Sequence, residues 1–216
     1  MLKNIINTTV RYLYLLTTIG LSKGSHITRY YRYYMYNHLA QFSEERNVNL
    51  RVLSISHSQG LARLLGFSDQ QITDAAYPDF DALRLPFADD EFDAIVSDQV
   101  LEHIEGDPYL AIKELFRVLK PNGIALHTTC FINPIHGHPN DYWRFTPEAL
   151  ILLVKNHGEI LDVGGWGNFY VWIFIILGLR SQPIPNAKWH PAYMLATNNQ
   201  SMWPIVTWVL AKKTKL

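Results

Sequence analysis

The chain has 216 residues, of which 48% are apolar and 18% are charged, which is the composition of a folded globular protein and excludes a disordered one. Its 19 basic and 19 acidic side chains give a formal charge of zero without a basic tract, so we expect no nucleic acid as a partner. Cys130 is the single cysteine, which excludes an internal disulfide and fits a reducing compartment. We therefore expect a cytoplasmic protein with a buried thiol and no metal site.

Two apolar segments raise the question of a membrane. Residues 5–21 lack the cleavage pattern of a secretory signal, and residues 166–179 are shorter than the roughly 20 residues that a spanning helix needs. We interpret both as core or as amphipathic, surface-seeking pieces, so that peripheral membrane contact stays open. The sequence is silent on the oligomeric state.

Residues 1–47 are predicted to form a helical N-terminal cap, followed by a Rossmann-type domain over residues 48–216. Leu13, Leu16 and Ile19 recur at helical spacing, and residues 22–25 form a break. A cluster of tyrosines then covers most of a helix circumference. Some of these rings face a cleft or a partner, or all of them pack within the protein in the ordinary way. The cluster consists of Tyr30, Tyr31, Tyr33, Tyr34 and Tyr36.

From residue 50 onward, short apolar runs alternate with amphipathic stretches. The runs predict strands, the last of them at a sheet edge, over residues 50–56, 71–76, 92–97, 124–131 and 205–211. The alternation indicates an α/β fold with a doubly wound, mainly parallel sheet and helices on both faces.

The amphipathic stretches predict helices over residues 59–66, 108–119 and 147–156. Thr146 is the expected N-cap of the third helix, and Pro147 is its expected first residue. Residues 164–168, GGWGN, are predicted to form a turn.

Four phrases between residues 85 and 123 carry the most specific information in the chain. They are LPF at 85–87, EFDAIVS at 91–97, VLEH at 100–103 and RVLKPNG at 117–123. In this order and spacing they resemble class I S-adenosylmethionine-dependent methyltransferases with a methyltransferase type 11-like domain. The resemblance covers about residues 50–170, and it implies a Rossmann-like fold with S-adenosylmethionine as the cofactor.

The glycine-rich turn of that family is eroded in this chain. The corresponding stretch, residues 52–60, reads VLSISHSQG and retains only Gly60 of the expected glycines. Ser54 stands in the usual acidic place, Ser56 and Ser58 are small enough to admit a ligand, and His57 is bulky where glycine is normal. The turn by itself therefore does not identify a cofactor site.

Later residues support a cofactor site more strongly. Asp74 lies 20 residues after Ser54, where a carboxylate can accept hydrogen bonds from ribose hydroxyls, although a solvated loop acid is an equal alternative. The resemblance implies that Asp81 and Ala82 contact the adenine. Ser97 and Asp98 end the following strand and are expected under the cofactor, with Gln99 close by. The full predicted cofactor set is Ser54, Ser56, Gly60, Asp74, Asp81, Ala82, Ser97 and Gln99.

The segment after the strand over residues 124–131 is dense in polar and aromatic side chains. Loops that leave the carboxyl end of a sheet strand point at the ligand cleft, so we expect them at the acceptor. The phrase HGHPNDYWRFTPEAL, residues 136–150, is similar to one subgroup of these methyltransferases, some of them associated with sugar or cell-surface glycan pathways.

A hydroxyl acceptor must lose a proton, and an imidazole suits that role. His136 is the first candidate base, and Asp141 could orient the histidine that acts. Tyr142 and Arg144 are candidate substrate-binding residues. A loop-stabilising His136 and an Arg144–Asp141 structural bridge stay open as alternatives. The remaining candidate bases are His138 and His103.

These observations predict methyl transfer from S-adenosylmethionine to an oxygen or nitrogen of a small-molecule or glycan-type acceptor. The alternative is a catalytically inactive methyltransferase-like scaffold, which the eroded turn would suit. An open cleft over Ser56, Asp74 and Asp81 that reaches His136 would support the enzyme, whereas a His57 side chain filling that cleft would support the scaffold. No GxGxxG follows the first strand, which disfavours a nicotinamide dehydrogenase.

Overall fold

The computed structural model describes residues 2–26, 35–36, 38–43, 48–137 and 140–214, which form two compact units. The small unit comprises residues 1–37 and 166–205, and the sheet unit comprises residues 38–165 and 206–216. The predicted division at residue 47 stays a prediction, and the compact units divide the chain differently. Tyr30, Tyr31, Tyr33 and Tyr34 lie outside the described residues, as does His138.

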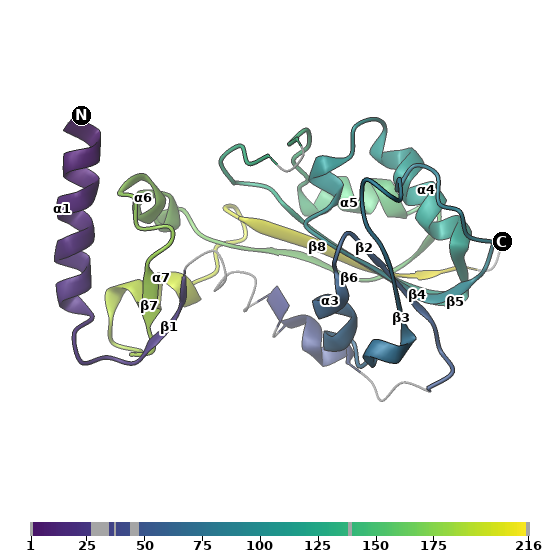
Figure 1. The fold of residues 1–216 in the computed structure, drawn as a ribbon, viewed down its shortest axis with the longest axis horizontal. Coiled ribbons are helices and arrows are strands. Elements are labelled where there is room, and N and C mark those ends of the chain that lie inside the picture. Colours follow the sequence, from purple (N-terminus) through teal and green to yellow (C-terminus); the bar gives the residue numbers. More distant parts are fainter. Residues whose placement is uncertain (1, 27–34, 37, 44–47, 138–139, 215–216) are drawn as a thin grey trace. The chain divides into compact units, whose positions relative to one another are not determined.

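The sheet unit is built on one six-stranded sheet in the order β3-β2-β4-β5-β8-β6 (Figure 1). Strands β3, β2, β4 and β5 run parallel, and β8 runs antiparallel to β5. The strand bounds are Val52–Ile55 for β2, Ile72–Ala75 for β3, Phe92–Asp98 for β4, Leu119–Cys130 for β5, Gly158–Trp166 for β6 and Val206–Lys213 for β8. The predicted mainly parallel α/β sheet is confirmed.

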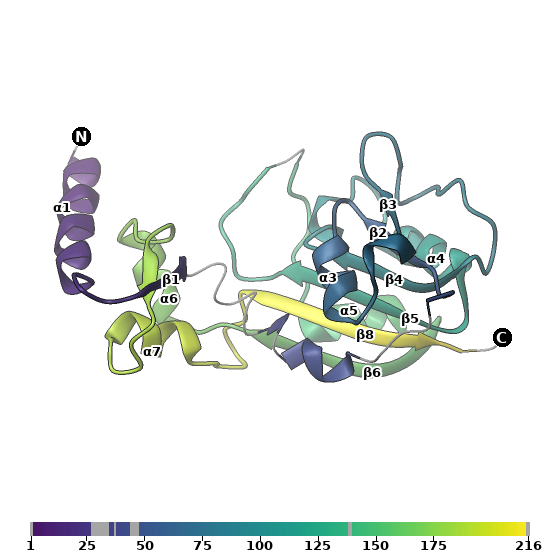
Figure 2. The same ribbon diagram turned by 60° about the horizontal axis from the view of Figure 1, so that its bottom comes forward.

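Three helices of the sheet unit follow β2, β4 and β5 in the chain: α3 (Gln59–Leu64), α4 (Pro108–Val118) and α5 (Pro147–Val154). Helices α4 and α5 lie on one face of the sheet and α3 lies on the other (Figures 1 and 2). The core between the sheet and α4 and α5 contains Ile95, Ile112 and Leu115, which are at most 1% exposed. Burial on both faces explains why β4 is an almost continuous apolar run.

Local sequence signals set the helix ends as predicted. The Thr146 side chain caps α5 by accepting a hydrogen bond from the Ala149 amide, and Pro147 is the first helical residue. Asp107 caps α4 in the same way, with Pro108 following it. Short 3-10 turns complete the unit at Ala40–Phe42, Asp69–Gln71 and Leu101–His103.

Two predictions about the end of the sheet are wrong. The strand predicted over residues 205–211 exists as β8, but it lies between β5 and β6 and not at the edge. The turn predicted over residues 164–168 is wrong at Gly164, Gly165 and Trp166, which belong to β6. A Cβ added at Gly164 would lie 2.7 Å from Cζ2 of Trp208, so this glycine serves close packing against an indole and not a turn.

The small unit contains α1 (Leu2–Thr17), α6 (Tyr170–Ile176), α7 (Pro191–Thr197) and the antiparallel pair of β1 (Lys23–His26) with β7 (Pro183–Pro185). The Tyr14 hydroxyl of α1 donates to the Pro183 carbonyl at 2.7 Å, and its ring meets Phe174 edge-on at 5.4 Å. Among the described residues, no helix combines the length and apolar character needed to cross a bilayer.

Substitution of Gly164 by alanine is expected to lower the free energy of unfolding by about 1–3 kcal/mol, because the added methyl group would overlap the Trp208 indole. That indole is 4% exposed and donates to Asp162 at 2.6 Å, so it cannot move aside without further loss. Urea denaturation would measure the change.

The matched control is Gly60→Ala in α3, where an added Cβ would meet no atom within 4 Å. This variant is expected to be unchanged or more stable by up to about 1 kcal/mol, because alanine favours a helix over glycine. Equal effects of the two substitutions would contradict the packing assigned to Gly164.

Candidate active site

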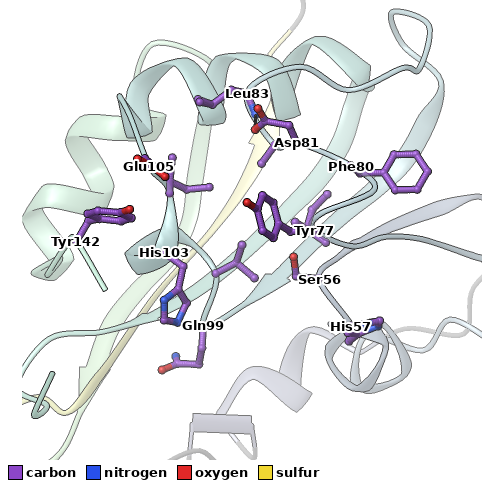
Figure 3. Close-up of a pocket in the computed structure, with 14 residues that line it drawn as sticks. Ser56, His57, Tyr77, Phe80, Asp81, Leu83, Gln99, His103, Glu105 and Tyr142 are labelled. Carbon is purple, nitrogen blue, oxygen red and sulfur yellow. Dashed lines mark hydrogen bonds between the residues drawn. The ribbon is translucent and has the colours of Figure 1, made fainter. Parts of the chain in front are cut away.

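A cavity of about 520 Å³ lies at the carboxyl ends of β2 and β4, a volume within the range of small-molecule sites. This is the edge of a parallel sheet at which ligands bind. Figure 3 shows Tyr77 and Asp81 on one side of it, and His103 and Tyr142 on the other. All of its lining residues belong to the sheet unit.

The turn after β2 forms one wall of the cavity through Ser56 and His57. Both residues adopt positive φ, 49° and 65°, in the left-handed region that favours glycine. This chain thus adopts, without glycine, a turn conformation that glycine favours. Ser58 ties the turn down, because its hydroxyl donates to the Ile55 carbonyl at 2.5 Å and accepts from the Asp98 amide at 2.8 Å.

Asp74 holds the same turn from the neighbouring strand. Its carboxylate accepts from the Ser54 hydroxyl at 2.6 Å and from the His57 amide at 3.1 Å, and it lies 2.8 Å from Nδ1 of His57. Ser54 and Asp74 are directly paired across β2 and β3. A carboxylate from β3 thus lies beside Ser54, and the His57 imidazole lies against it and stays 76% exposed.

Four predicted cofactor residues line the cavity: Ser56, Asp81, Ala82 and Gln99. Asp81 is exposed, and its Oδ1 accepts from the Leu83 amide at 2.8 Å, which fixes the carboxylate at the cavity rim. Gln99 has φ of 59° and donates its amide to the Thr128 carbonyl at 2.9 Å.

The other four, Ser54, Gly60, Asp74 and Ser97, do not line the cavity. Ser97 is buried and hydrogen-bonds Nδ1 of His127 at 2.8 Å. Burial lowers the pKa of His127 to about 4, so this imidazole is neutral at physiological pH. Asp74 is engaged by the turn, and its predicted contact with a ribose stays a prediction.

Three side chains from separate segments converge behind the cavity. Glu102, Cys130 and His136 bring their potential ligand atoms within 4.8 Å of one another. Glu102 is fully buried, and its Oε2 accepts from the Thr129 hydroxyl at 2.8 Å, while its Oε1 has no hydrogen-bond partner in the described part of the chain. Burial raises the pKa of Glu102, and it raises that of Cys130 to about 12, so the predicted buried thiol is confirmed.

Two histidines connect this group to the cavity. His103 lines the cavity, and its ring meets that of His136 edge-on at 5.1 Å. Nδ1 of His103 hydrogen-bonds the Asn140 carbonyl, which can only accept, so the neutral ring keeps its lone pair on Nε2. Nδ1 of His136 lies 3.0 Å from Asp141, and its Nε2 lies 3.9 Å from Glu102.

Asp141 and Arg144 form a bidentate ion pair within the loop. The guanidinium holds the pKa of the Asp141 carboxyl well below its ordinary value, although the side chain is only 1% exposed. Arg144 therefore has the contacts of the structural bridge that the sequence left open. Tyr142 lines the cavity, and its amide donates to the Glu102 carbonyl at 2.8 Å.

Sequence reasoning missed Phe80 and Glu105 as cavity-lining residues, and it assigned no role in the site to Glu102. Glu105 follows two residues after His103, so the segment after β4 carried a usable signal. Phe80 lies in a loop without a periodic pattern. The Glu102 side chain accepts a hydrogen bond from Thr129 of β5, which lies 27 residues later in the sequence, so no local pattern reveals the contact.

Comparisons with known proteins agree on one class. Residues 37–127 match a family model described as a methyltransferase domain. An uncharacterized methyltransferase of Mycobacterium leprae is 38% identical over 80 residues, which are 36% of this chain and 29% of that protein. The matched stretch thus spans less than a third of the relative's length.

Two solved structures share the fold. The [4+2]-cyclase SpnF has a TM-score of 0.51 at 17% identity, over 84% of this chain and 80% of its own. Phosphoethanolamine N-methyltransferase 2 of Haemonchus contortus, solved with S-adenosyl-L-methionine, has a TM-score of 0.50 at 17% identity, over 82% of this chain and 51% of its own.

The match over residues 37–127 therefore indicates a methyltransferase domain, the class that the four sequence phrases predict, and the sheet unit has the fold of these two solved structures. The cavity fits the cofactor of this class. Asp81 and Glu105 offer carboxylates for amino and hydroxyl groups, Tyr77 and Phe80 offer apolar walls for a purine, and Ser56 is small.

Replacement of Arg144 by methionine is expected to lower the free energy of unfolding by on the order of 3 kcal/mol, because the Asp141 carboxylate would lose its partner while nearly buried. Since the native pKa of Asp141 lies below its ordinary value, this contribution is complete at neutral pH and is lost as the pH falls below about 4.

Chemical denaturation at neutral pH would measure the loss, with Arg63→Met as the control. The Arg63–Asp69 pair is exposed at 56% and 71%, so its removal is expected to cost less than about 1 kcal/mol. A similar loss of unfolding free energy in both variants would show that the Asp141–Arg144 pair stabilises the protein no more than an exposed ion pair does.

Proposed function

We propose that the protein transfers a methyl group from S-adenosylmethionine to an oxygen or nitrogen of a small-molecule or glycan-type acceptor. The observation that carries the proposal is the cavity at the carboxyl ends of β2 and β4, which adjoins the buried group around Glu102 and His136. A binding scaffold would need the cavity alone. The histidines beside it can serve as the base that transfer to a hydroxyl acceptor needs.

In this proposal Asp81 and Ala82 hold the adenine, and the turn around Ser56 lets the chain approach the methionine portion. Gln99 lines the same cavity. When bound, S-adenosylmethionine supplies an electrophilic methyl group on a sulfonium centre. The protein's main task is then to align the acceptor with that methyl group and to exclude water.

His103 and His136 are the proposed bases for a hydroxyl acceptor. His103 presents a ring nitrogen that can accept a proton at the cavity, and His136 lies against its ring. Asp141 orients His136 through Nδ1, which leaves Nε2 of that ring to accept a proton. Tyr142 borders the acceptor side, and Arg144 acts by holding Asp141. Ser54 and Asp74 support the turn through their hydrogen bonds, whereas Gly60 and Ser97 do not line the cavity.

Binding of S-adenosylhomocysteine to the purified protein is the first test. We expect a micromolar dissociation constant by calorimetry, and a loss of at least about 10-fold for Asp81→Ala, because a carboxylate hydrogen bond of about 1.5–3 kcal/mol is removed.

Asp79→Ala is the matched control, since Asp79 is exposed in the same loop and does not line the cavity. Its affinity is expected to equal that of the unsubstituted protein. If a protein with an intact circular dichroism spectrum does not bind the ligand at millimolar concentration, the proposed enzyme activity is contradicted. The catalytically inactive scaffold is then supported.

A second test separates catalysis from binding. His136→Gln is expected to lower the rate of transfer to a hydroxyl acceptor by about 100-fold, the usual contribution of general-base catalysis. Affinity for S-adenosylhomocysteine should stay within about 3-fold, because His136 does not line the cavity. A screen of alcohols, amines and glycans would first identify the best acceptor. The rate of S-adenosylhomocysteine release with that acceptor would then be measured.

His157→Gln is the control, because the His157 carbonyl accepts from the Thr214 amide near the amino end of β5, and His157 does not line the cavity. Loss of activity in this variant equal to that in His136→Gln would contradict a direct role for His136. Unchanged activity in His136→Gln would leave His103 as the base.

A further inference from the structure

The chain has a net charge of zero, but all of its acidic residues lie in the sheet unit. The small unit contains seven Lys or Arg residues and no Asp or Glu, so its formal charge is +7. The sheet unit holds the remaining 12 basic and all 19 acidic side chains, for a charge of −7. No carboxylate side chain within the small unit can therefore neutralise its cations.

The small unit also exposes a stripe of large apolar side chains along the end of α1 and the turn that follows it, called the α1 stripe below. Tyr12, Leu13, Leu16 and Ile19 are 59–72% exposed, and they recur at the spacing that places side chains on one helix face. Arg11 is exposed directly beside the stripe. A water-exposed run of this kind marks a surface that binds something.

This stripe is not the face by which α1 packs within its own unit. The packing side carries Tyr14 of α1 and Thr18, the residue directly after the helix, which are 9% and 0% exposed. Tyr14 bonds Pro183 of β7 and contacts Phe174 of α6, so the helix is anchored from that side. The stripe is left unpartnered within the small unit as described.

A second exposed group in the same unit repeats the combination of apolar and basic side chains. Ile173 and Ile176 of α6 are 48% and 66% exposed. Trp189, which precedes α7, is 69% exposed and follows the exposed Lys188. Tryptophan and tyrosine beside lysine and arginine are the residues favoured at a membrane–water interface.

We propose that the small unit docks on the surface of an anionic lipid bilayer through the α1 stripe and its flanking cations. The absence of acidic side chains removes repulsion from anionic headgroups, and the apolar stripe supplies what insertion between them requires. A nucleic acid would use the cations but not the exposed leucines. At 16 residues, α1 is too short to span a bilayer and would lie along its surface. This docking does not depend on the proposed methyl transfer.

Flotation of the full chain with lipid vesicles tests the proposal. We expect at least about 10-fold stronger binding to phosphatidylcholine vesicles that contain about 30% phosphatidylglycerol than to pure phosphatidylcholine, and weaker binding at about 0.5 M salt. Leu16→Glu is expected to reduce binding to the anionic vesicles by at least about 10-fold, because it places a charge in the stripe.

Leu110→Glu in α4 of the sheet unit is the matched control. It makes the same chemical change at a leucine that is 54% exposed, compared with 60% for Leu16, and it should leave binding unchanged. Equal losses in both variants would show attraction by net charge alone and overturn the role of the stripe.

Two further readouts can overturn the proposal. A melting temperature lowered much more by Leu16→Glu than by Leu110→Glu would show that the stripe is covered in the folded protein. A dimer in light scattering that Leu16→Glu dissociates would assign the stripe to a second copy. Absence of binding to anionic vesicles by a folded, monomeric protein would overturn the docking itself.

Discussion

The carboxylate of Asp74 holds the turn after β2, and the candidate site depends on that turn. It accepts hydrogen bonds from Ser54 and from the backbone of His57, while Ser58 fastens the turn to β4. Two non-glycine residues are thereby kept at positive φ, a conformation that costs on the order of 1–2 kcal/mol each. The cavity wall therefore persists although the family's glycines and first-strand acid are absent.

The second constraint is that the surroundings of two buried carboxyl groups near the cavity shift their pKa values in opposite directions. Arg144 keeps Asp141 ionised, whereas burial raises the pKa of Glu102 and favours its neutral form. His136 lies between them, with one ring nitrogen toward each. Environments that push the pKa values of neighbouring acids apart are characteristic of sites that move protons. The fold alone does not imply this chemistry, since a [4+2]-cyclase shares it.

Much of the sheet unit could be predicted because its signals are local. The buried run of β4 and the caps of α4 and α5 are written in consecutive residues. The position of β8 could not be predicted, because β6 lacks a clear apolar alternation and its Gly164 packs against Trp208. The role of Asp74 and the contact of Glu102 with Thr129 likewise depend on pairing between distant strands. The charge difference between the units could not be predicted either, because it depends on residues 166–205 forming one compact unit with the N-terminal segment.

A crystal structure of the protein grown with S-adenosylhomocysteine would test the central claim most directly. The account predicts the ligand in the cavity at the carboxyl ends of β2 and β4, with its adenine beside Asp81 and Ala82 and its sulfur facing His103. It further predicts that Asp74 keeps its bonds to the turn. A ligand bound elsewhere, or a cavity that stays free of it at saturating concentration, would contradict the account.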